Sequence, residues 1–194
     1  MALTGILLAA GRGRRFDPAG ARNKLLQRLP GGEPVVAASA GKLLAVFARV
    51  VAVVPPHDGG VAEVLRRLGC DVTVCPDADA GMGLSLAHAI RHSLPGQPPG
   101  QGWLVALGDM PFVDLATLRA LDGAVGEGAA IAAPLFEGRR GNPVAFGPTH
   151  RDGLLALDGD QGARRLLSSS PVATIAVPDA GILRDIDSPA DLAG

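Results

Sequence analysis

The chain has 194 residues, of which 47% are hydrophobic and 19% are charged, and its formal net charge is −1. This length and composition predict one folded domain over residues 1–194 and exclude a disordered chain. A net charge close to zero argues against a nucleic-acid or membrane partner, and an aromatic content of 3% argues against base-stacking surfaces for single strands.

The two cysteines, Cys70 and Cys75, are spaced neither as a zinc pair nor as a redox motif. We interpret them as free thiols at the two ends of one short strand, in a cytoplasmic protein. The N-terminus lacks the charged segment and cleavage site of a signal peptide, so none is expected. The apolar run 43–56 is interrupted by Arg49, which predicts a helix followed by a strand rather than a membrane span.

The first predicted element is a buried strand over residues 3–10, which carry no charge. A loop rich in glycine and arginine follows it and ends at Lys24. The loop carries Gly11, Gly13 and Gly20, and Arg12, Arg14, Arg15 and Arg22. Glycines let backbone N–H groups approach a ligand, and guanidinium groups fit phosphate oxygens, so this loop is a candidate polyphosphate site. A solvated surface loop is the alternative, and the spacing matches neither a dinucleotide fingerprint nor a P-loop.

Helix and strand patterns alternate along the rest of the chain. We predict helices over 34–47, 60–68, 81–94, 114–122, 147–155 and 161–167 and after Ser188, and strands over 49–54, 71–75, 103–107, 129–134, 142–146 and 172–177. This alternation predicts an α/β fold with a single doubly wound, mostly parallel sheet. The strands 129–134 and 142–146 predict a small antiparallel edge, and Asp114 is expected to cap the helix that follows it.

Asp109 follows the predicted strand 103–107 directly, at the end of the strand where an α/β sheet places its ligands. A carboxylate there suits Mg²⁺, which binds one or two carboxylates together with substrate phosphates. A simple turn aspartate fits the spacing equally well. Asp185 and Asp187 follow another extended stretch, and each is either a second metal ligand or a cap of the helix after Ser188; the spacing alone favours capping.

His88 and His92 are four residues apart on one predicted helix, which is a spacing that can bind zinc. The residue after His88 is not glutamate and no third ligand is evident, so we interpret the pair as part of a solvated helix face. The segment 81–85, Gly-Met-Gly-Leu-Ser, either brings backbone N–H groups and Ser85 to a ligand or is an ordinary helix start.

Taken together, these segments resemble the molybdenum-cofactor nucleotidyltransferases over nearly the whole chain. The resemblance rests, in chain order, on Leu8-Ala9-Ala10-Gly11 with Gly13, Arg15 and Lys24-Leu25-Leu26, on Gly81-Met82-Gly83 with Ser85, on Gly108-Asp109-Met110-Pro111, on Gly141-Asn142-Pro143-Val144, on Gly159-Asp160-Gln161-Gly162-Ala163-Arg164 and on Asp185-Ile186-Asp187-Ser188-Pro189. It is closest to the cytidylyltransferase branch, because the guanylyltransferase branch usually has Leu-Ala-Gly-Gly in the first motif. The first loop is longer than is usual in the family, and Asn142 stands where the family often has histidine.

The resemblance implies a Rossmann-like nucleotidyltransferase fold and a Mg²⁺-dependent enzyme that transfers CMP from CTP to the phosphate of molybdopterin and releases pyrophosphate. It implies that Lys24, Arg15 and Asp109 are catalytic, that Asp109 and Asp187 hold the metal and that Asn142 meets the acceptor. The implied nucleotide-binding residues are Leu8, Ala9, Ala10, Gly11, Gly13, Arg15, Lys24, Gly81, Gly83, Ser85 and Asp109.

A molybdenum hydroxylase or its maturation chaperone is an implied protein partner. Three alternatives stay open at this point. One is a related nucleotidyltransferase that uses GTP or another phosphorylated acceptor, such as a sugar phosphate or phospholactate. Another is a non-catalytic nucleotide-binding maturation factor for molybdenum hydroxylases. The third is a structural domain whose basic loop is only solvated.

Overall fold

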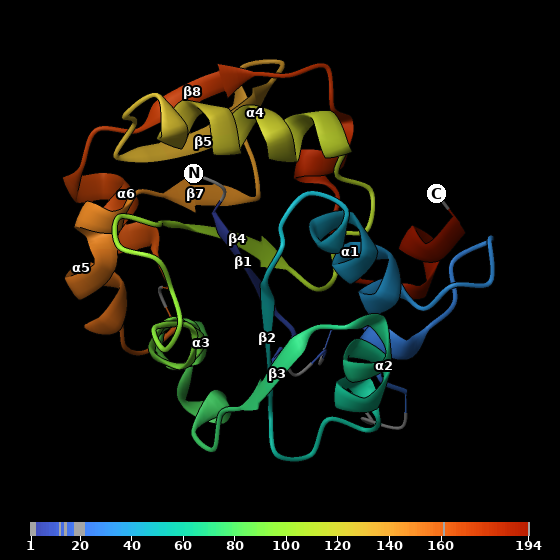
Figure 1. Ribbon diagram of the computed structural model, residues 1–194. Coiled ribbons are helices and arrows are strands. Elements are labelled where there is room, and N and C mark those ends of the chain that lie inside the picture. Colours follow the sequence, from blue (N-terminus) through green and yellow to red (C-terminus); the bar gives the residue numbers. More distant parts are fainter. Residues whose placement is uncertain (1–2, 12, 14, 18–21, 161, 194) are drawn as a thin grey trace.

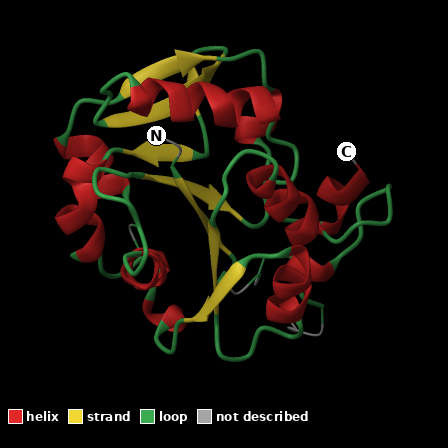
Figure 2. Ribbon diagram, viewed as in Figure 1, coloured by secondary structure: helices red, strands yellow, loops and turns green. Residues whose placement is uncertain are grey.

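A computed structural model describes residues 3–11, 13, 15–17, 22–160 and 162–193, and these form an eight-stranded sheet with helices on both faces (Figures 1 and 2). The strands are β1 (Thr4–Leu8), β2 (Val50–Val54), β3 (Asp71–Val74), β4 (Trp103–Leu107), β5 (Ile131–Phe136), β6 (Arg139–Arg140), β7 (Val144–Phe146) and β8 (Ala173–Ala176). The α-helices are α1 (Val35–Leu44), α2 (Val61–Leu68), α3 (Met82–Ser93), α4 (Leu115–Gly126), α5 (Arg151–Leu155) and α6 (Arg164–Ser169). The 3₁₀ helices are η1 (Lys24–Leu26), η2 (Ala78–Ala80), η3 (Pro148–His150), η4 (Ala180–Leu183) and η5 (Pro189–Ala193).

The strand order β3-β2-β1-β4-β7-β5-β6, with β8 beside β5, confirms the expected α/β fold with a mostly parallel sheet. β3, β2, β1 and β4 run parallel to one another, and β8 is parallel to β5. The antiparallel strands gather on the other side of the sheet, where β7 lies between β4 and β5 rather than at the end. All three residues of β7 are apolar and buried, which agrees with a strand inside the sheet that is covered on both faces.

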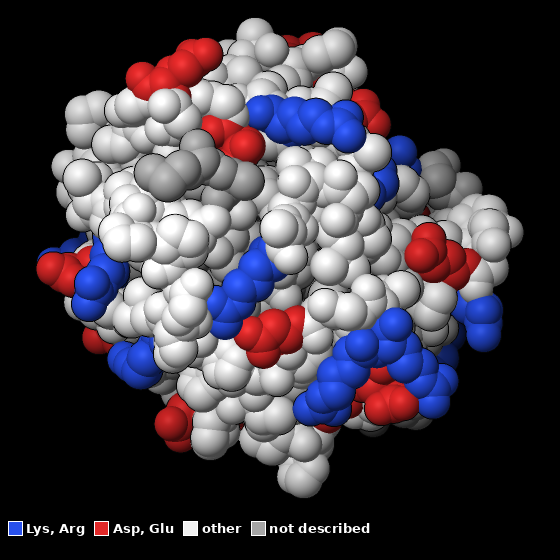
Figure 3. Space-filling model, viewed as in Figure 1, with Lys and Arg blue, Asp and Glu red and all other residues white. Residues whose placement is uncertain are grey.

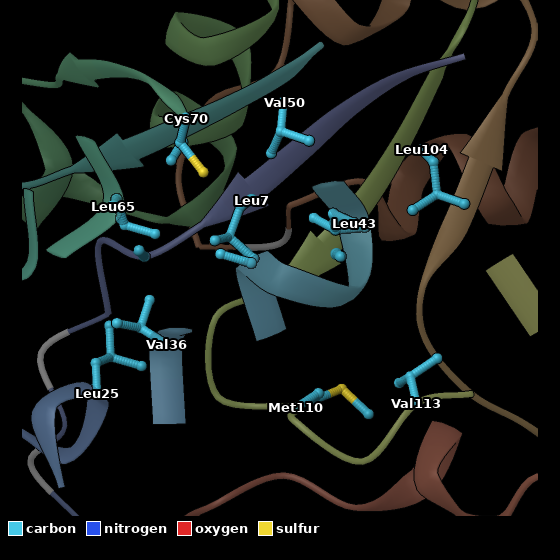
Figure 4. Packing of buried hydrophobic residues seen from close by; sticks show 14 of the residues in the cluster. Leu7, Leu25, Val36, Leu43, Val50, Leu65, Cys70, Leu104, Met110 and Val113 are labelled. Atoms are coloured by element: carbon cyan, nitrogen blue, oxygen red, sulfur yellow. The ribbon is translucent and has the colours of Figure 1, made fainter. Parts of the chain in front are cut away.

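Apart from Thr4, the residues of β1, β2 and β4 are apolar, and their side chains divide between two cores, one on each face of the sheet. Ile6 and Val51 belong to a cluster with residues of α3 and α5. Leu7 and Leu104 belong to a cluster with residues of α1, α2 and α4, part of which Figure 4 shows. Leu25 of η1 is 4% exposed and belongs to the cluster that contains Leu7. This burial holds η1, and with it Lys24, near the carboxyl end of β1.

The cysteines and the apolar run 43–56 have the structures that the sequence predicts. Cys70 and Cys75 are free and buried at the two ends of β3, and burial raises the pKa of the Cys70 thiol to about 11. The run 43–56 forms the end of α1 and then β2. Among the described residues, none of the helices combines the length and the apolar character needed to cross a membrane.

The helix α4 differs from its prediction at both ends. It continues past the predicted end at 122 to Gly126, because Ala124 and Val125 pack against the core and outweigh the low helix propensity of Gly123. At its start, Asp114 occupies the N-cap position but its side chain makes no capping hydrogen bond. The prediction that Asp114 caps this helix is therefore wrong.

Asp179, which precedes η4, holds the start of α4 instead. Its Oδ2 accepts hydrogen bonds from the backbone N–H of Asp114 (2.8 Å) and from the hydroxyl of Thr117 (2.7 Å). Its Oδ1 accepts from the backbone N–H of Gly181 (2.9 Å), and Asp179 is only 4% exposed. This buried carboxylate ties α4 to η4, the element that leads into residues 185–187.

Replacing Asp179 with alanine should lower the free energy of unfolding by about 2–3 kcal/mol, because three buried or partly buried donors lose their acceptor. Urea unfolding at neutral pH measures the change. The matched control is Asp114→Ala at the other end of the same contact, which removes no side-chain hydrogen bond of the cap and should cost less than about 0.5 kcal/mol. Equal losses in the two variants would contradict this role of Asp179.

Candidate active site

The loop after β1 presents Lys24 through several local contacts. Phe16 is buried, and its backbone N–H and that of Asp17 donate to the carbonyl of Gly13. Asn23 caps η1 by accepting a hydrogen bond from Leu25 N (3.0 Å), and its amide donates to Asp58 O (2.9 Å). These contacts fix the end of the loop that carries Lys24. The predicted phosphate ligands Arg12, Arg14 and Gly20 lie outside the described residues.

Asp109 follows β4 at the same edge of the sheet. The preceding residue, Gly108, donates its N–H to Leu8 O (2.9 Å), which keeps the ends of β1 and β4 together. The carbonyl of Asp109 accepts from the N–H of Ile186 (2.9 Å), and Ile186 is fully buried. The neighbours of Ile186, Asp185 and Asp187, are thereby held beside Asp109.

Three carboxylates meet at this point. Asp109, Asp185 and Asp187 each place a carboxylate oxygen within 4.8 Å of those of the other two. Lys24 Nζ lies 2.5 Å from Asp109 Oδ2 and 3.5 Å from Asp187 Oδ1, and Arg15 donates to Asp187 Oδ2 at 2.5 Å. Two predicted cations and three acidic residues from distant parts of the chain thus form one cluster, which we call the acidic cluster.

The capping role that spacing alone favoured for Asp187 is wrong, because its side chain pairs with Lys24 and Arg15. The turn at Ser188 is held by Asp191, whose Oδ2 accepts from the N–H groups of Asp187 and Ser188 and from the Ser188 hydroxyl.

The surroundings of Asp185 within the acidic cluster disfavour its charged form. Burial raises the pKa of Asp185, and the nearby carboxylates of Asp187 and Asp109 raise it further. Carboxylate oxygens are the ligands that hard divalent cations such as Mg²⁺ and Mn²⁺ prefer. The donor set of the acidic cluster therefore fits such an ion, with Asp185 as a further candidate ligand beside Asp109 and Asp187.

A cleft of about 410 Å³ opens beside the acidic cluster, at the carboxyl ends of β1 and β4. Seven of the predicted nucleotide-binding residues line it: Leu8, Ala10, Gly11, Lys24, Gly81, Ser85 and Asp109. Ala78, Asp79, Met82, Leu107 and Asp160 also line it, and none of these was assigned a role from the sequence. Asp160 belongs to the motif 159–164, one of those on which the family resemblance rests. That motif was the sequence signal that could have identified Asp160 as a site residue.

Four predicted nucleotide-binding residues lie elsewhere or act indirectly. Ala9 is 2% exposed and packs in the core. Gly13 has a φ of 58° and faces the aliphatic chain of Lys24, and Arg15 lies on Asp187. Gly83 donates its N–H to Gly159 O (2.8 Å), so this group is already used within the protein.

Gly81 and Gly83 bring two segments into backbone contact at the wall of the cleft. A Cβ at Gly81 would overlap the carbonyl of Gly159, and a Cβ at Gly83 would overlap that of Asp158. Gly81 also has a φ of 138°, which side chains disfavour. These glycines fit the segment 158–160 against the start of α3, and in this way they position Asp160 at the cleft.

Asn142, the predicted acceptor residue, does not line the main cleft. It lines a small neighbouring cavity of about 20 Å³ together with Pro143 and Met110, and Leu107 lines both spaces. The backbone N–H of Asn142 donates to Ile182 O (3.0 Å), which connects this residue to the segment that carries Asp185 and Asp187. A role in acceptor binding stays a prediction.

The prediction of a solvated helix face fits His92 but is wrong for His88, which is half-buried against β3. His92 is exposed and its Nε2 lies 2.9 Å from Asp71 Oδ1, while His88 Nε2 lies 2.8 Å from Thr73 Oγ1. Both contacts join α3 to β3, so the histidines have a structural part there.

On the face of the molecule that Figure 3 shows, acidic and basic side chains of the described residues are interspersed.

His88 should make stability depend on pH. Burial, followed by the charges of His92 and Arg91, lowers the pKa of His88 below its ordinary value of 6.5. The unfolded chain therefore takes up this proton at higher pH than the folded protein, so the stabilising contribution is complete above 6.5 and is lost as the pH falls below it. His88→Gln should reduce the fall in unfolding free energy between about pH 7.5 and about pH 5.5, measured by urea unfolding.

The pKa of Asp71 is lowered by hydrogen bonds from His92 and Arg49, which outweigh the opposing effect of burial, so Asp71 titrates below its ordinary 3.8 and outside that window. An unchanged pH slope in His88→Gln would contradict the role of His88.

The fold and the site together define an α/β protein with a ligand cleft at the carboxyl ends of its parallel strands, beside a cluster suited to a divalent cation. Residues 5–174 match the family of MobA-like NTP transferase domains, and the chain belongs to this family of nucleotidyltransferases.

The chain is also similar to three other proteins. The purine catabolism protein PucB of Bacillus subtilis is 30% identical over 96% of this chain and 92% of its own length. The crystal structure of Rv0371c from Mycobacterium tuberculosis superposes with a TM-score of 0.82 and 29% identity, covering 98% of this chain and 95% of that one. A manganese complex of Rv0371c has a TM-score of 0.73 and 27% identity over 100% of this chain and 94% of that one. The molybdopterin-guanine dinucleotide biosynthesis protein A of Archaeoglobus fulgidus shares the fold, with a TM-score of 0.69 and 20% identity over 98% of this chain and 95% of that one.

Proposed function

We propose that this protein is an enzyme that transfers CMP from CTP to the phosphate of molybdopterin and releases pyrophosphate. The observation that carries the proposal is the convergence of Lys24, Arg15 and three carboxylates beside the 410 Å³ cleft, which Lys24 and Asp109 line. Transfer of a nucleotidyl group needs alignment and charge neutralisation rather than a covalent intermediate on the protein. The cluster offers both kinds of charge that this requires.

Each residue has a distinct task in this reaction. Gly11 and the nearby backbone face the polyphosphate, and Arg15 contacts its β- and γ-phosphates. Lys24 provides positive charge at the α-phosphate, where negative charge grows in the transition state. Asp109 and Asp187, with Asp185 beside them, hold Mg²⁺, which when bound neutralises the phosphates and orients the reacting groups.

The nucleoside lies at the end of the cleft away from Lys24, where α3 begins. Figure 1 shows α3 and η1 on opposite sides of the end of β1. Asp79 and Asp160 line the cleft, and Asp160 is exposed next to the start of α3. Carboxylates accept hydrogen bonds, so they favour a base with an exocyclic amino group, as in cytosine or guanine, over uracil.

The acceptor approaches from the side of Asn142. Leu107 lines both the main cleft and the cavity at Asn142, so the two spaces adjoin. The ordered motifs that resemble the molybdenum-cofactor enzymes support molybdopterin as this acceptor, and a molybdenum hydroxylase or its chaperone is the proposed recipient of the product.

The test is pyrophosphate release in the presence of Mg²⁺ and molybdopterin, with CTP, GTP and UTP in separate reactions. Release with CTP alone supports the proposal, and the product should have the mass of a cytidine dinucleotide of the pterin. Release with GTP alone would replace CTP by GTP and keep the reaction. Binding of CTP without release under any of these conditions would favour a non-catalytic maturation factor.

A further inference from the structure

Lys24 occupies the position among the carboxylates where a divalent cation would bind. Its ammonium group contacts Asp109 Oδ2 at 2.5 Å and lies 3.5 Å from Asp187 Oδ1. The Lys24 side chain is only 10% exposed, whereas those of Asp109 and Asp187 are 19% and 29% exposed. The ammonium therefore lies deeper than its partners, between oxygens that belong to the proposed metal ligands.

The carboxylate oxygens of Asp109 and Asp187 cannot bind the Lys24 ammonium and a divalent cation at the same time without weakening one of the two interactions. Mg²⁺ requires oxygens at about 2.0–2.1 Å in a nearly ideal octahedron, which leaves little freedom to share them with an ammonium between the ligands. Two cations a few ångströms apart in a partly buried site also repel each other strongly. The three carboxylates of the acidic cluster exceed Lys24 and Arg15 by only one charge, so most of their attraction is already satisfied.

Lys24 has a second place to go. It lines the 410 Å³ cleft as well as contacting the acidic cluster. Its aliphatic chain lies against Gly13. A Cβ atom added to Gly13 would lie 3.5 Å from Lys24 Cγ, which is an ordinary van der Waals contact, so Gly13 does not crowd the lysine. The stem can therefore stay in place while the ammonium turns from the carboxylates to a phosphate in the cleft.

We infer that Lys24 closes the divalent-cation site in the nucleotide-free protein, and that a polyphosphate opens it by drawing the ammonium into the cleft. This inference rests on the divalent-cation site of the proposed function and adds its regulation. Because binding free energies are linked, the nucleotide must then tighten the metal by the same factor by which the metal tightens the nucleotide. Lys24 acts as an internal competitor that discourages binding of the metal alone.

The first experiment titrates the nucleotide-free protein with Mn²⁺ alone and follows free Mn²⁺ by electron paramagnetic resonance. Lys24→Met keeps the aliphatic length and removes the competing charge, so it should bind Mn²⁺ about tenfold or more tightly than the wild type. Lys42 is the other lysine of the chain and donates to Val113 O, away from the carboxylates. Lys42→Met should therefore bind Mn²⁺ as the wild type does.

Asp109→Asn in the Lys24→Met background identifies the site, since it should remove the gained affinity. Equal dissociation constants for wild type and Lys24→Met would overturn the inference, and so would a gain that survives Asp109→Asn.

A second experiment uses the wild-type protein and does not depend on how a variant folds. Acetic anhydride labels free amines, and mass spectrometry reports Lys24 and Lys42 separately. Saturating Mn²⁺ should raise the labelling of Lys24 several-fold over that in a chelator, because the metal displaces the ammonium, while Lys42 stays constant. Unchanged labelling of Lys24 at saturating Mn²⁺ would contradict the inference.

The outcomes separate this inference from the proposed function. Tighter Mn²⁺ binding by Lys24→Met without pyrophosphate release from any nucleotide would keep the competition and remove the proposed reaction. Pyrophosphate release from CTP with equal Mn²⁺ affinity in both proteins would keep the reaction and remove the competition.

Discussion

We expect the Asp109→Asn variant to release pyrophosphate from CTP about a thousandfold more slowly than the wild type, a loss of ~4 kcal/mol of transition-state stabilisation. Asp109 is the carboxylate that Lys24 contacts at 2.5 Å, and its backbone carbonyl holds the segment of Asp185 and Asp187. Asparagine keeps the shape but removes the charge that would hold the divalent cation. Steady-state release of pyrophosphate across a range of Mg²⁺ concentrations measures the loss.

The matched control is Asp114→Asn, which makes the same change at an exposed aspartate whose side chain makes no capping hydrogen bond. It should retain the wild-type rate. Excess Mg²⁺ should recover only part of the activity of Asp109→Asn, since an amide oxygen is a weaker ligand than a carboxylate. Full activity of Asp109→Asn at ordinary Mg²⁺ would remove Asp109 from the metal site.

The order of helices and strands was predictable because β1, β2 and β4 are short apolar runs, and the segments between them have helical patterns. The place of β7 between β4 and β5 was not predictable. Three apolar residues indicate that a strand is buried, but they do not indicate which strands lie beside it. The extension of α4 depended on burial of Ala124 and Val125, which local propensity does not include.

The candidate site was predictable where a functional residue stands in a recognisable local sequence pattern. Lys24 at the end of a glycine-rich loop and Asp109 after a buried strand both do so, and the structure brings them to 2.5 Å. Helix capping and metal binding, by contrast, both use aspartates near the start of a helix. The spacing alone therefore could not distinguish the two roles, and the prediction that Asp187 is a cap was wrong. Asp179 binds the start of α4 across 65 residues of sequence, and such a long-range partner has no local pattern.

The second large effect is expected from Lys24→Met, which should lower kcat by about a hundredfold to a thousandfold and weaken CTP binding far less. A charge that acts on the α-phosphate as negative charge develops there contributes mainly to the transition state. Single-turnover rates at saturating CTP, together with the dissociation constant of CTP, separate the two effects. Lys42→Met, the same change at the other lysine, should leave the CTP dissociation constant unchanged.

The metal ligands are intact in Lys24→Met, so a lower kcat in this variant cannot be ascribed to a lost cation. This separates Lys24→Met from Asp109→Asn, in which metal affinity and rate should fall together. If kcat and CTP affinity fell by the same factor in Lys24→Met, the lysine would act on the bound substrate and the transition state alike. Its contact with Asp109 would then belong to nucleotide binding, and the stabilisation of the transition state would have to come from the cation and Arg15.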